Sequence, residues 1–286
     1  MTVIDQHLTD AVALYNADVV QGITAVPDDS VHYSVFSPPF SSLYTYTALP
    51  NDMGNCRTDA EFFAHFAFLT GELYRVLMPG RLLSFHCMNL PTTKERDGYI
   101  GIEDFRGDLI RAFQKAGFIY HSEVCIWKDP VTAMQRTKAI GLLHKQVKKD
   151  SCRSRQGIAD YVVTMLKPGE NREPVAGRFD HFAGDGYDAE PATAGLKVAG
   201  RNDAEKALER YSIEVWQRYA SPVWMDINQS RTLNFQAARD DNDSRHICPL
   251  QLDVIHRCLQ LWSNPGDTVL SPFAGIGSEG HEAVKL

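Results

Sequence analysis

The chain has 286 residues, of which 44% are hydrophobic, 23% charged and 10% aromatic, and its formal net charge is −7. This composition excludes disordered, collagen-like and coiled-coil chains, and no apolar run is long enough to span a membrane. The six cysteines are scattered without a CxxC pair, which argues against a zinc site or a disulfide framework and favours reduced thiols in a cytoplasmic protein. Because the net charge is negative, any contact with nucleic acid must come from a local basic surface.

Short apolar, β-branched runs alternate with amphipathic segments of helix length, which is typical of an α/β fold with a largely parallel sheet. In chain order, the predicted strands are Val31–Phe36, Arg81–His86, Ile119–Trp127, Ile158–Leu166 and Thr268–Leu270. The predicted helices are Asp59–Leu77, Phe105–Ala116, Ala204–Arg218 and Leu250–Trp262. We expect Asp59 to cap the first helix, Pro79-Gly80 to stop it, and Gly117 to close the second.

Two long segments between these elements have a biased composition. Residues 128–156 carry eight lysines and arginines against two aspartates, a pattern typical of a solvated charged face or of a surface that follows a nucleic-acid backbone. Residues 168 to about 200 are rich in Gly, Pro, Ala and Asp with little periodicity, which predicts a long loop or lid.

The first chemical motif is Ser37-Pro38-Pro39-Phe40, directly after a predicted buried strand. Its prolines fix φ and favour extended geometry, so the motif predicts a rigid loop at the carboxyl end of a strand, where open α/β sheets bind ligands. The Ser37 hydroxyl and the Pro38 carbonyl could accept both hydrogens of a planar exocyclic amine while Phe40 stacks on its ring, which is catalysis by positioning. An isolated motif of this kind is more often a surface turn.

The second motif is the glycine-rich segment Phe273–Gly280, which follows the predicted strand Thr268–Leu270 and opens a predicted helix. Gly275, Gly277 and Gly280 fit the GxGxxG pattern that lets a backbone approach a nucleotide-like ligand. A dinucleotide-dependent enzyme or a plain tight turn would show the same pattern. The acidic residue that the pattern places about 20 residues further on would lie beyond Leu286.

Together, SPPF followed by FAGIG resembles the β class of amino-group DNA methyltransferases, which use S-adenosylmethionine to methylate N6 of adenine or N4 of cytosine. In that class the [DNS]-P-P-[YFW] motif precedes the FxGxG motif, a circular permutation relative to other methyltransferases. Three further segments resemble the family in its order: YNAD with VPDDSV at 15–31, LYRVLMPG at 73–80, and HICPL with WSNPGD at 246–267. Two positions depart from the family pattern: Ser271 replaces an aspartate, and Ala17 replaces a common glycine.

The resemblance implies a Rossmann-like methyltransferase sheet, mostly parallel with helices on both faces and with permuted motif order. Residues 1–167 and 246–286 would form the catalytic core, and 168–245 an inserted target-recognition or lid region. The implied catalytic residues are Ser37, Pro38, Pro39 and Phe40. The implied cofactor-binding residues are Asp18, Ser37, His246, Pro249, Ser271, Phe273, Gly275 and Gly277. The predicted DNA-binding residues are Tyr44, Tyr46, Lys145, Lys148, Lys149, Arg153, Arg155 and Arg231. Further candidates for base contacts are Trp216, Arg218, Trp224, Asn228, Gln229 and Asn234.

The function that follows is methyl transfer from S-adenosylmethionine to the exocyclic amine of a cytosine or adenine flipped out of duplex DNA. The nitrogen would attack directly, with no metal and no covalent enzyme intermediate. Alternative hypotheses are a non-catalytic DNA-binding protein on a methyltransferase scaffold, which Ser271 favours, and a protein-glutamine N-methyltransferase. We recognise no nuclease-like or helicase-like segment, which favours an orphan enzyme over a restriction-modification subunit; a homodimer is compatible with the family.

His86, at the end of the neighbouring strand, could face the cleft, although a lone histidine is more often structural.

Overall fold

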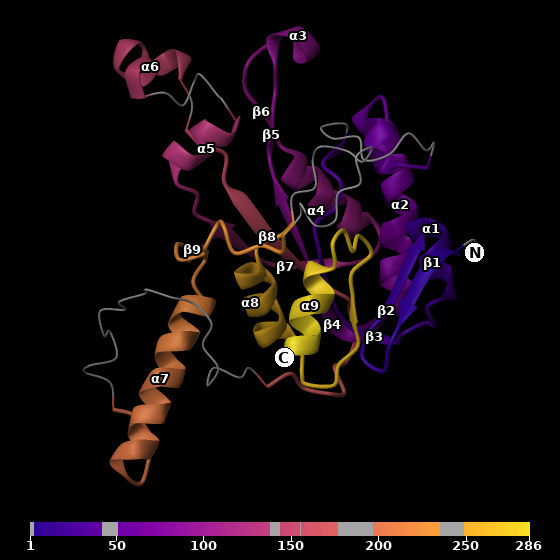
Figure 1. Cartoon of the computed structure of the whole chain (residues 1–286), viewed down its shortest axis with the longest axis vertical. Coiled ribbons are helices and arrows are strands. Elements are labelled where there is room, and N and C mark those ends of the chain that lie inside the picture. The colour runs from indigo at the N-terminus through magenta and orange to yellow at the C-terminus, as the bar shows by residue number, and fades with distance from the viewer. Residues whose placement is uncertain (1–2, 42–50, 138–143, 155, 177–196, 235–248) are drawn as a thin grey trace.

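The computed structural model describes residues 3–41, 51–137, 144–154, 156–176, 197–234 and 249–286 (Figure 1). Its centre is a six-stranded sheet in the order β10-β3-β4-β8-β7-β9. These strands are β10 (Val269–Leu270), β3 (Val31–Phe36), β4 (Leu77–Met88), β8 (Asp160–Leu166), β7 (Ile119–Ile126) and β9 (Val223–Trp224). Every neighbouring pair is parallel except the two that include β8, which runs against β4 and β7. The predicted α/β fold with a mostly parallel sheet is confirmed.

Two short antiparallel pairs and nine α-helices accompany this sheet in the described residues, together with short 3-10 turns. The pairs are β1 (Val3–Leu8) with β2 (Ala13–Ala17) and β5 (Leu90–Pro91) with β6 (Ile102–Glu103). The helices are α1 (Val19–Gly22), α2 (Asp59–Val76), α3 (Lys94–Asp97), α4 (Phe105–Lys115), α5 (Pro130–Thr137), α6 (His144–Lys149), α7 (Asp203–Tyr219), α8 (Leu252–Trp262) and α9 (Ser278–Lys285). In the described part of the chain, no helix is long and apolar enough to cross a bilayer.

Helices cover both faces of the sheet, as expected. One apolar layer joins α2 and α4 to the sheet, and includes Phe36, Phe66 and Phe113. The other joins α8 to the opposite face through Tyr33 and Val35, and Figure 1 shows α9 beside α8. Because successive strand residues point to opposite faces, the predicted strand Val31–Phe36 contributes apolar side chains to both layers, with Phe36 in one and Tyr33 and Val35 in the other.

The predicted boundaries around α2 need two corrections. Its N-cap is Thr58, whose side chain accepts from the Glu61 backbone N–H at 3.2 Å, and not Asp59. The helix already ends at Val76, and Pro79-Gly80 lies inside β4, where the register against β3 shifts. Gly80 has φ +73°, and a Cβ there would lie 2.4 Å from the backbone nitrogen of Asn171. The Pro-Gly pair therefore forms a bulge that only glycine fits.

One strand of the central sheet, β9, was not predicted from the sequence pattern. The strand β9 is only two residues long, too short to show a period, yet it joins β7 and contributes the buried Trp224. Residues 223–224, within the predicted insert, thus belong to the central sheet. By contrast, α7 projects away from the layers (Figure 1).

Buried ionic contacts hold the short strand β10 beside β3 at their amino ends. Arg81, which is 2% exposed, donates to the backbone carbonyl of His32 at 2.9 Å and pairs with the Asp267 carboxylate. His32 Nδ1 accepts from the Thr268 N–H at 3.0 Å, so its Nε2 carries the proton and faces Glu173 and Asp267. A metal-ligand set is suggested by the closeness of His32, Glu173 and Asp267. However, the His32 Nε2 carries a hydrogen and so offers no lone pair, and the Asp267 carboxylate already pairs with Arg81. The group therefore stabilises the junction of β10 and β3.

Candidate active site

The two motifs lie on adjacent strands. Ser37 follows β3 and Ser271 follows β10, and these strands are parallel with Tyr33 opposite Val269. The Ser34 hydroxyl donates to the Leu270 carbonyl at 2.8 Å, and the rings of Phe36 and Phe273 pack with centroids 5.9 Å apart. Because the carboxyl ends of parallel neighbours share one edge of a sheet, SPPF and the glycine turn meet there although they lie near opposite ends of the sequence.

The proline corner is fixed from several sides. Pro38 and Pro39 are buried, while Ser37 and Phe40 are half-buried. The Phe40 ring lies edge-on to the ring of His86 and to the ring of Phe105, both at 6.3 Å between centroids. These contacts with β4 and α4 give the corner the rigidity that its two prolines predict.

Three residues outside the two motifs extend from Ser37, and the first is His86, which its place at the end of the neighbouring strand had suggested could face this site. The Ser37 Oγ lies 3.0 Å from His86 Nδ1, and His86 Nε2 lies 3.2 Å from Asp160 Oδ2. The other Asp160 oxygen lies 2.5 Å from Lys128 Nζ. Asp160 is the first residue of β8, and since β8 runs against its neighbours, its amino end reaches the edge that holds the carboxyl ends of β3 and β4.

The Asp160 carboxylate is held ionised although it is 4% exposed. Burial by itself would raise the pKa of Asp160, but its electrostatic interactions with His86 and then with Lys128 outweigh burial and leave this pKa below its ordinary value. The site therefore holds a buried negative charge on the far side of His86 from Ser37.

The glycine turn has the space that a ligand needs. Gly275 and Gly277 have φ of +52° and +84°, and an added Cβ at either would meet nothing within 4 Å. In the described structure, the buried hydroxyls of Ser271 and Ser278 have no hydrogen-bond partner. Open space beside orphaned donors at the start of α9 fits a nucleotide-like cofactor with polar groups.

The remaining predicted cofactor residues are only partly described. The Asp18 side chain caps α1 by accepting from the Gln21 N–H at 3.0 Å, and Val19 and Val20 pack on the same core layer as Phe273. Pro249 is half-buried shortly before α8. His246 lies outside the described residues. The structure thus brings Ser37, Ser271, Phe273, Gly275 and Gly277 to one edge of the sheet.

The predicted DNA-binding residues divide into three groups. Lys145, Lys148 and Lys149 are exposed on α6, which with α5 lies beyond the carboxyl edge of the sheet (Figure 1). Arg231 pairs with Asp253. Arg153 ends the short turn Ser151–Arg153, and Tyr44, Tyr46 and Arg155 lie outside the described residues.

Two candidates for base contacts are core residues instead. Trp224 is 1% exposed, and its Nε1 donates to the Tyr219 carbonyl at 3.1 Å. Arg218 is buried and pairs with Asp226 at 2.5 Å. Both side chains are used within the protein, so neither is presented to a base; of the predicted candidates nearby, Trp216 is half exposed.

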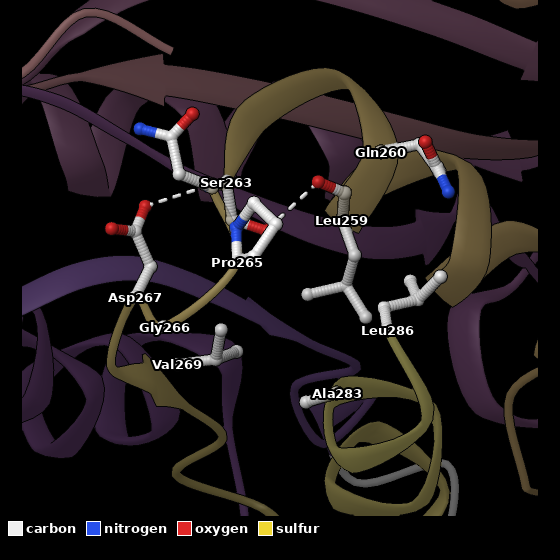
Figure 2. A pocket seen from close by; sticks show the side chains of 10 residues that line it. Leu259, Gln260, Ser263, Pro265, Gly266, Asp267, Val269, Ala283 and Leu286 are labelled. Atoms are coloured by element: carbon white, nitrogen blue, oxygen red, sulfur yellow. Dashed lines mark hydrogen bonds between the residues drawn. The ribbon is translucent and has the colours of Figure 1, made fainter. Parts of the chain in front are cut away.

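A hollow between the ends of α8 and α9 and the Asn264–Asp267 turn is separate from this edge (Figure 2). Asp267 accepts there from the Asn264 N–H at 2.8 Å, which stabilises the turn of the WSNPGD segment. No residue of the proline corner or of the segment Phe273–Gly280 lines it. The hollow therefore lies outside the candidate site.

Glu279, in the first turn of α9, carries an unusual carboxyl group. It is 5% exposed, and burial raises its pKa from 4.5 to about 7. Because the native pKa is the higher one, native protein binds the proton more tightly, and ionisation destabilises the fold as pH rises from about 4.5 to about 7. Glu279→Gln, which copies the protonated carboxyl, is expected to raise the unfolding free energy at pH 8 by up to about 3 kcal/mol and to change it little near pH 5. Urea denaturation at both pH values measures this.

Glu209→Gln, on the exposed face of α7, is the matched control and should leave stability unchanged at both pH values. A stability gain for Glu279→Gln of equal size at pH 5 and pH 8 would contradict the burial effect.

Comparisons with known proteins agree with this geometry. The model of the DNA methylase family N6_N4_Mtase matches residues 31–286. The Thermus thermophilus protein TTHA0409, solved in complex with S-adenosyl-L-methionine, is 20% identical, with a TM-score of 0.58 over 94% of this chain and 83% of its own. PvuII DNA methyltransferase, which is cytosine-N4-specific, is 12% identical, with a TM-score of 0.59 over 99% of this chain and 82% of its own. At these identities the two structures share the fold; no curated protein sequence matches.

Proposed function

Since the chain belongs to the N6_N4_Mtase family of DNA methylases, we propose that it transfers the methyl group of S-adenosylmethionine to the exocyclic amine of a cytosine or adenine in duplex DNA. The single observation that supports this most is the pairing of β3 with β10, which places the proline corner and the glycine turn after adjacent parallel strands, with the Phe36 ring 5.9 Å from the Phe273 ring. An amine held at Ser37 and a methyl donor held at Gly275 and Gly277 would share one edge of the sheet.

The division of work between the motifs follows from their chemistry. Bound S-adenosylmethionine supplies an electrophilic methyl group on a positively charged sulfur. The Ser37 hydroxyl and the Pro38 carbonyl are the acceptors that would orient the amine, and Phe40 is the ring on which the base would stack. The orphaned Ser271 and Ser278 hydroxyls and the open glycine turn would hold the methyl donor. Rate enhancement would come from alignment of the nitrogen with the methyl carbon.

The base is flipped out of the duplex in this proposal, because a stacked amine cannot reach the buried corner. A serine at the first position of the motif favours cytosine N4 as the target, and adenine N6 is the alternative. Nucleoside mass spectrometry of DNA treated with the enzyme separates N4-methylcytosine from N6-methyladenine.

The direct test is incubation of the protein with duplex DNA and S-adenosylmethionine labelled in the methyl group. Label is expected in the DNA, and none in a protein substrate rich in glutamine. Binding to DNA without binding of S-adenosylmethionine in calorimetry would instead support the non-catalytic alternative.

We propose that the enzyme acts in the cytoplasm. The free thiols of the described cysteines accord with this location.

The exposed lysines of α6 are proposed to contact the DNA backbone next to the candidate active site. Replacing Lys145, Lys148 and Lys149 together by glutamine is expected to weaken binding to any duplex and to reduce the salt slope by about 3, since each phosphate contact contributes about one counterion. Fluorescence anisotropy at several salt concentrations measures this. Lys115→Gln is the control: Lys115 is exposed at the end of α4 that points away from the proline corner, so this change should leave the salt slope unchanged. An unchanged slope in the triple variant would exclude α6 from the interface.

A further inference from the structure

We propose that His86, Asp160 and Lys128 form a proton relay that serves Ser37 during methyl transfer. The inference rests on the proposed function, and it assigns roles to three residues outside the two motifs. In it, Ser37 touches the amine, while His86 and Asp160 are positioning residues that act through Ser37.

The distances define one line of contacts from Ser37 in the proline corner to the buried Asp160 carboxylate. Ser37 Oγ and His86 Nδ1 are 3.0 Å apart, and His86 Nε2 and Asp160 Oδ2 are 3.2 Å apart. A carboxylate beside Nε2 favours the neutral tautomer with its proton on Nε2, which leaves the lone pair of Nδ1 free to accept from the Ser37 hydroxyl. This is the arrangement of hydroxyl, imidazole and carboxylate that activates a hydroxyl for proton exchange.

The relay provides an acceptor for the proton that the amine loses, which the Ser37 hydroxyl alone cannot provide. As the N–C bond forms, the C–S bond breaks and sulfur keeps its electron pair, so the amine nitrogen becomes cationic and must lose a proton. A neutral hydroxyl accepts that proton only if it releases its own. The amine proton would pass to Ser37 Oγ while the Ser37 proton passes to His86 Nδ1. The imidazolium that results lies against the Asp160 carboxylate, which stabilises it.

The surroundings of His86 suit this role. Its side chain is 12% exposed, and that of Asp160 is 6% exposed, so solvent screens their interaction weakly. Among the described residues, the groups that face it are Ser37, the Asp160 carboxylate with Lys128 behind it, and the apolar ring of Phe40. The Lys128 Nζ lies 2.5 Å from Asp160 Oδ1, and His86 Nε2 lies 3.2 Å from Asp160 Oδ2, so the two partners approach different oxygens of the carboxylate.

A purely structural lock would use the same contacts, so the test must separate positioning from proton transfer. His86→Asn does this, because the amide oxygen of asparagine can accept from Ser37 at the place of Nδ1 but cannot take up a proton. We expect its single-turnover rate constant for methyl transfer to fall about 100-fold, with an unchanged Kd for S-adenosylmethionine. His121→Asn, an exposed histidine at the start of β7, is the matched control.

The pH dependence of the rate constant for methyl transfer separates the two roles, because a purely structural contact would not alter the shape of this profile. The pH profile of the wild-type rate should contain a limb that is absent in His86→Asn, because only the wild type has an imidazole that can take up the proton. Activity of His86→Asn within about threefold of the wild type, or the same limb in both, would overturn the relay and leave the proposed function intact.

A spectroscopic measurement tests the relay even without turnover. The ¹⁵N shifts of the His86 ring in the folded wild type are expected to show a proton on Nε2 and none on Nδ1 at neutral pH, and Asp160→Asn should shift this tautomer balance. A proton on Nδ1 in the wild type would overturn the relay whatever the enzyme assay shows. Absence of methyl transfer by wild-type protein with the expected tautomer would instead contradict the proposed function, while the arrangement of Ser37, His86 and Asp160 would stand.

Discussion

Ser37→Ala is expected to lower the rate constant for methyl transfer to DNA by about 1000-fold. The substitution removes both the acceptor that orients the amine and the only contact of the motif with His86 Nδ1, each of which is worth about 10- to 1000-fold in comparable sites. Because Ser37 is half-buried and alanine fits its place, the fold should remain intact. Single-turnover assays with labelled S-adenosylmethionine measure the chemical step directly.

Ser30→Ala, just before β3, is the control for the loss of a serine hydroxyl, since the Ser30 hydroxyl donates locally to the Pro27 carbonyl. It should keep full activity. Phe40→Leu extends the test to the ring: leucine keeps apolar contact with the core but cannot stack on a base, and Phe68→Leu on the exposed face of α2 is its control. Methyl transfer that survives both Ser37→Ala and Phe40→Leu would show that the amine binds elsewhere.

Gly277→Val is expected to abolish measurable binding of S-adenosylmethionine. The position has φ +84°, and a side chain there would project into space that the protein leaves open, where the methyl donor is proposed to lie. Calorimetry at concentrations that saturate the wild type measures the loss. The shift of Tm by S-adenosylmethionine in the wild type should disappear with it.

The strain of valine at positive φ has to be separated from the loss of the ligand site. Gly98→Val is suited to this, because Gly98 also has positive φ (+79°) and an equally open surrounding, but lies after α3 away from the glycine turn. Both variants should lose a similar stability, about 1–2 kcal/mol, and only Gly277→Val should lose the ligand. Equal binding by both variants would remove the glycine turn from the cofactor site.

The sequence alone determined the features that depend on local chemistry. The apolar run Val31–Phe36 predicted β3 with its correct ends, and the apolar stripe after Asp59 predicted α2 to within one residue at its end. The position of SPPF and of the glycine turn directly after strands followed from proline geometry and from glycine at positive φ. These features were readable because strand period, helix period and turn preferences act over a few neighbouring residues.

Only the tertiary structure decided which distant residues meet. The reversed direction of β8 brings its first residue, Asp160, to His86 at the reactive edge; a parallel strand would have placed it at the opposite edge. The burial of Trp224 depends likewise on β9 pairing with β7. Strand order and direction arise from packing between segments that are far apart along the chain, and no local periodicity encodes them.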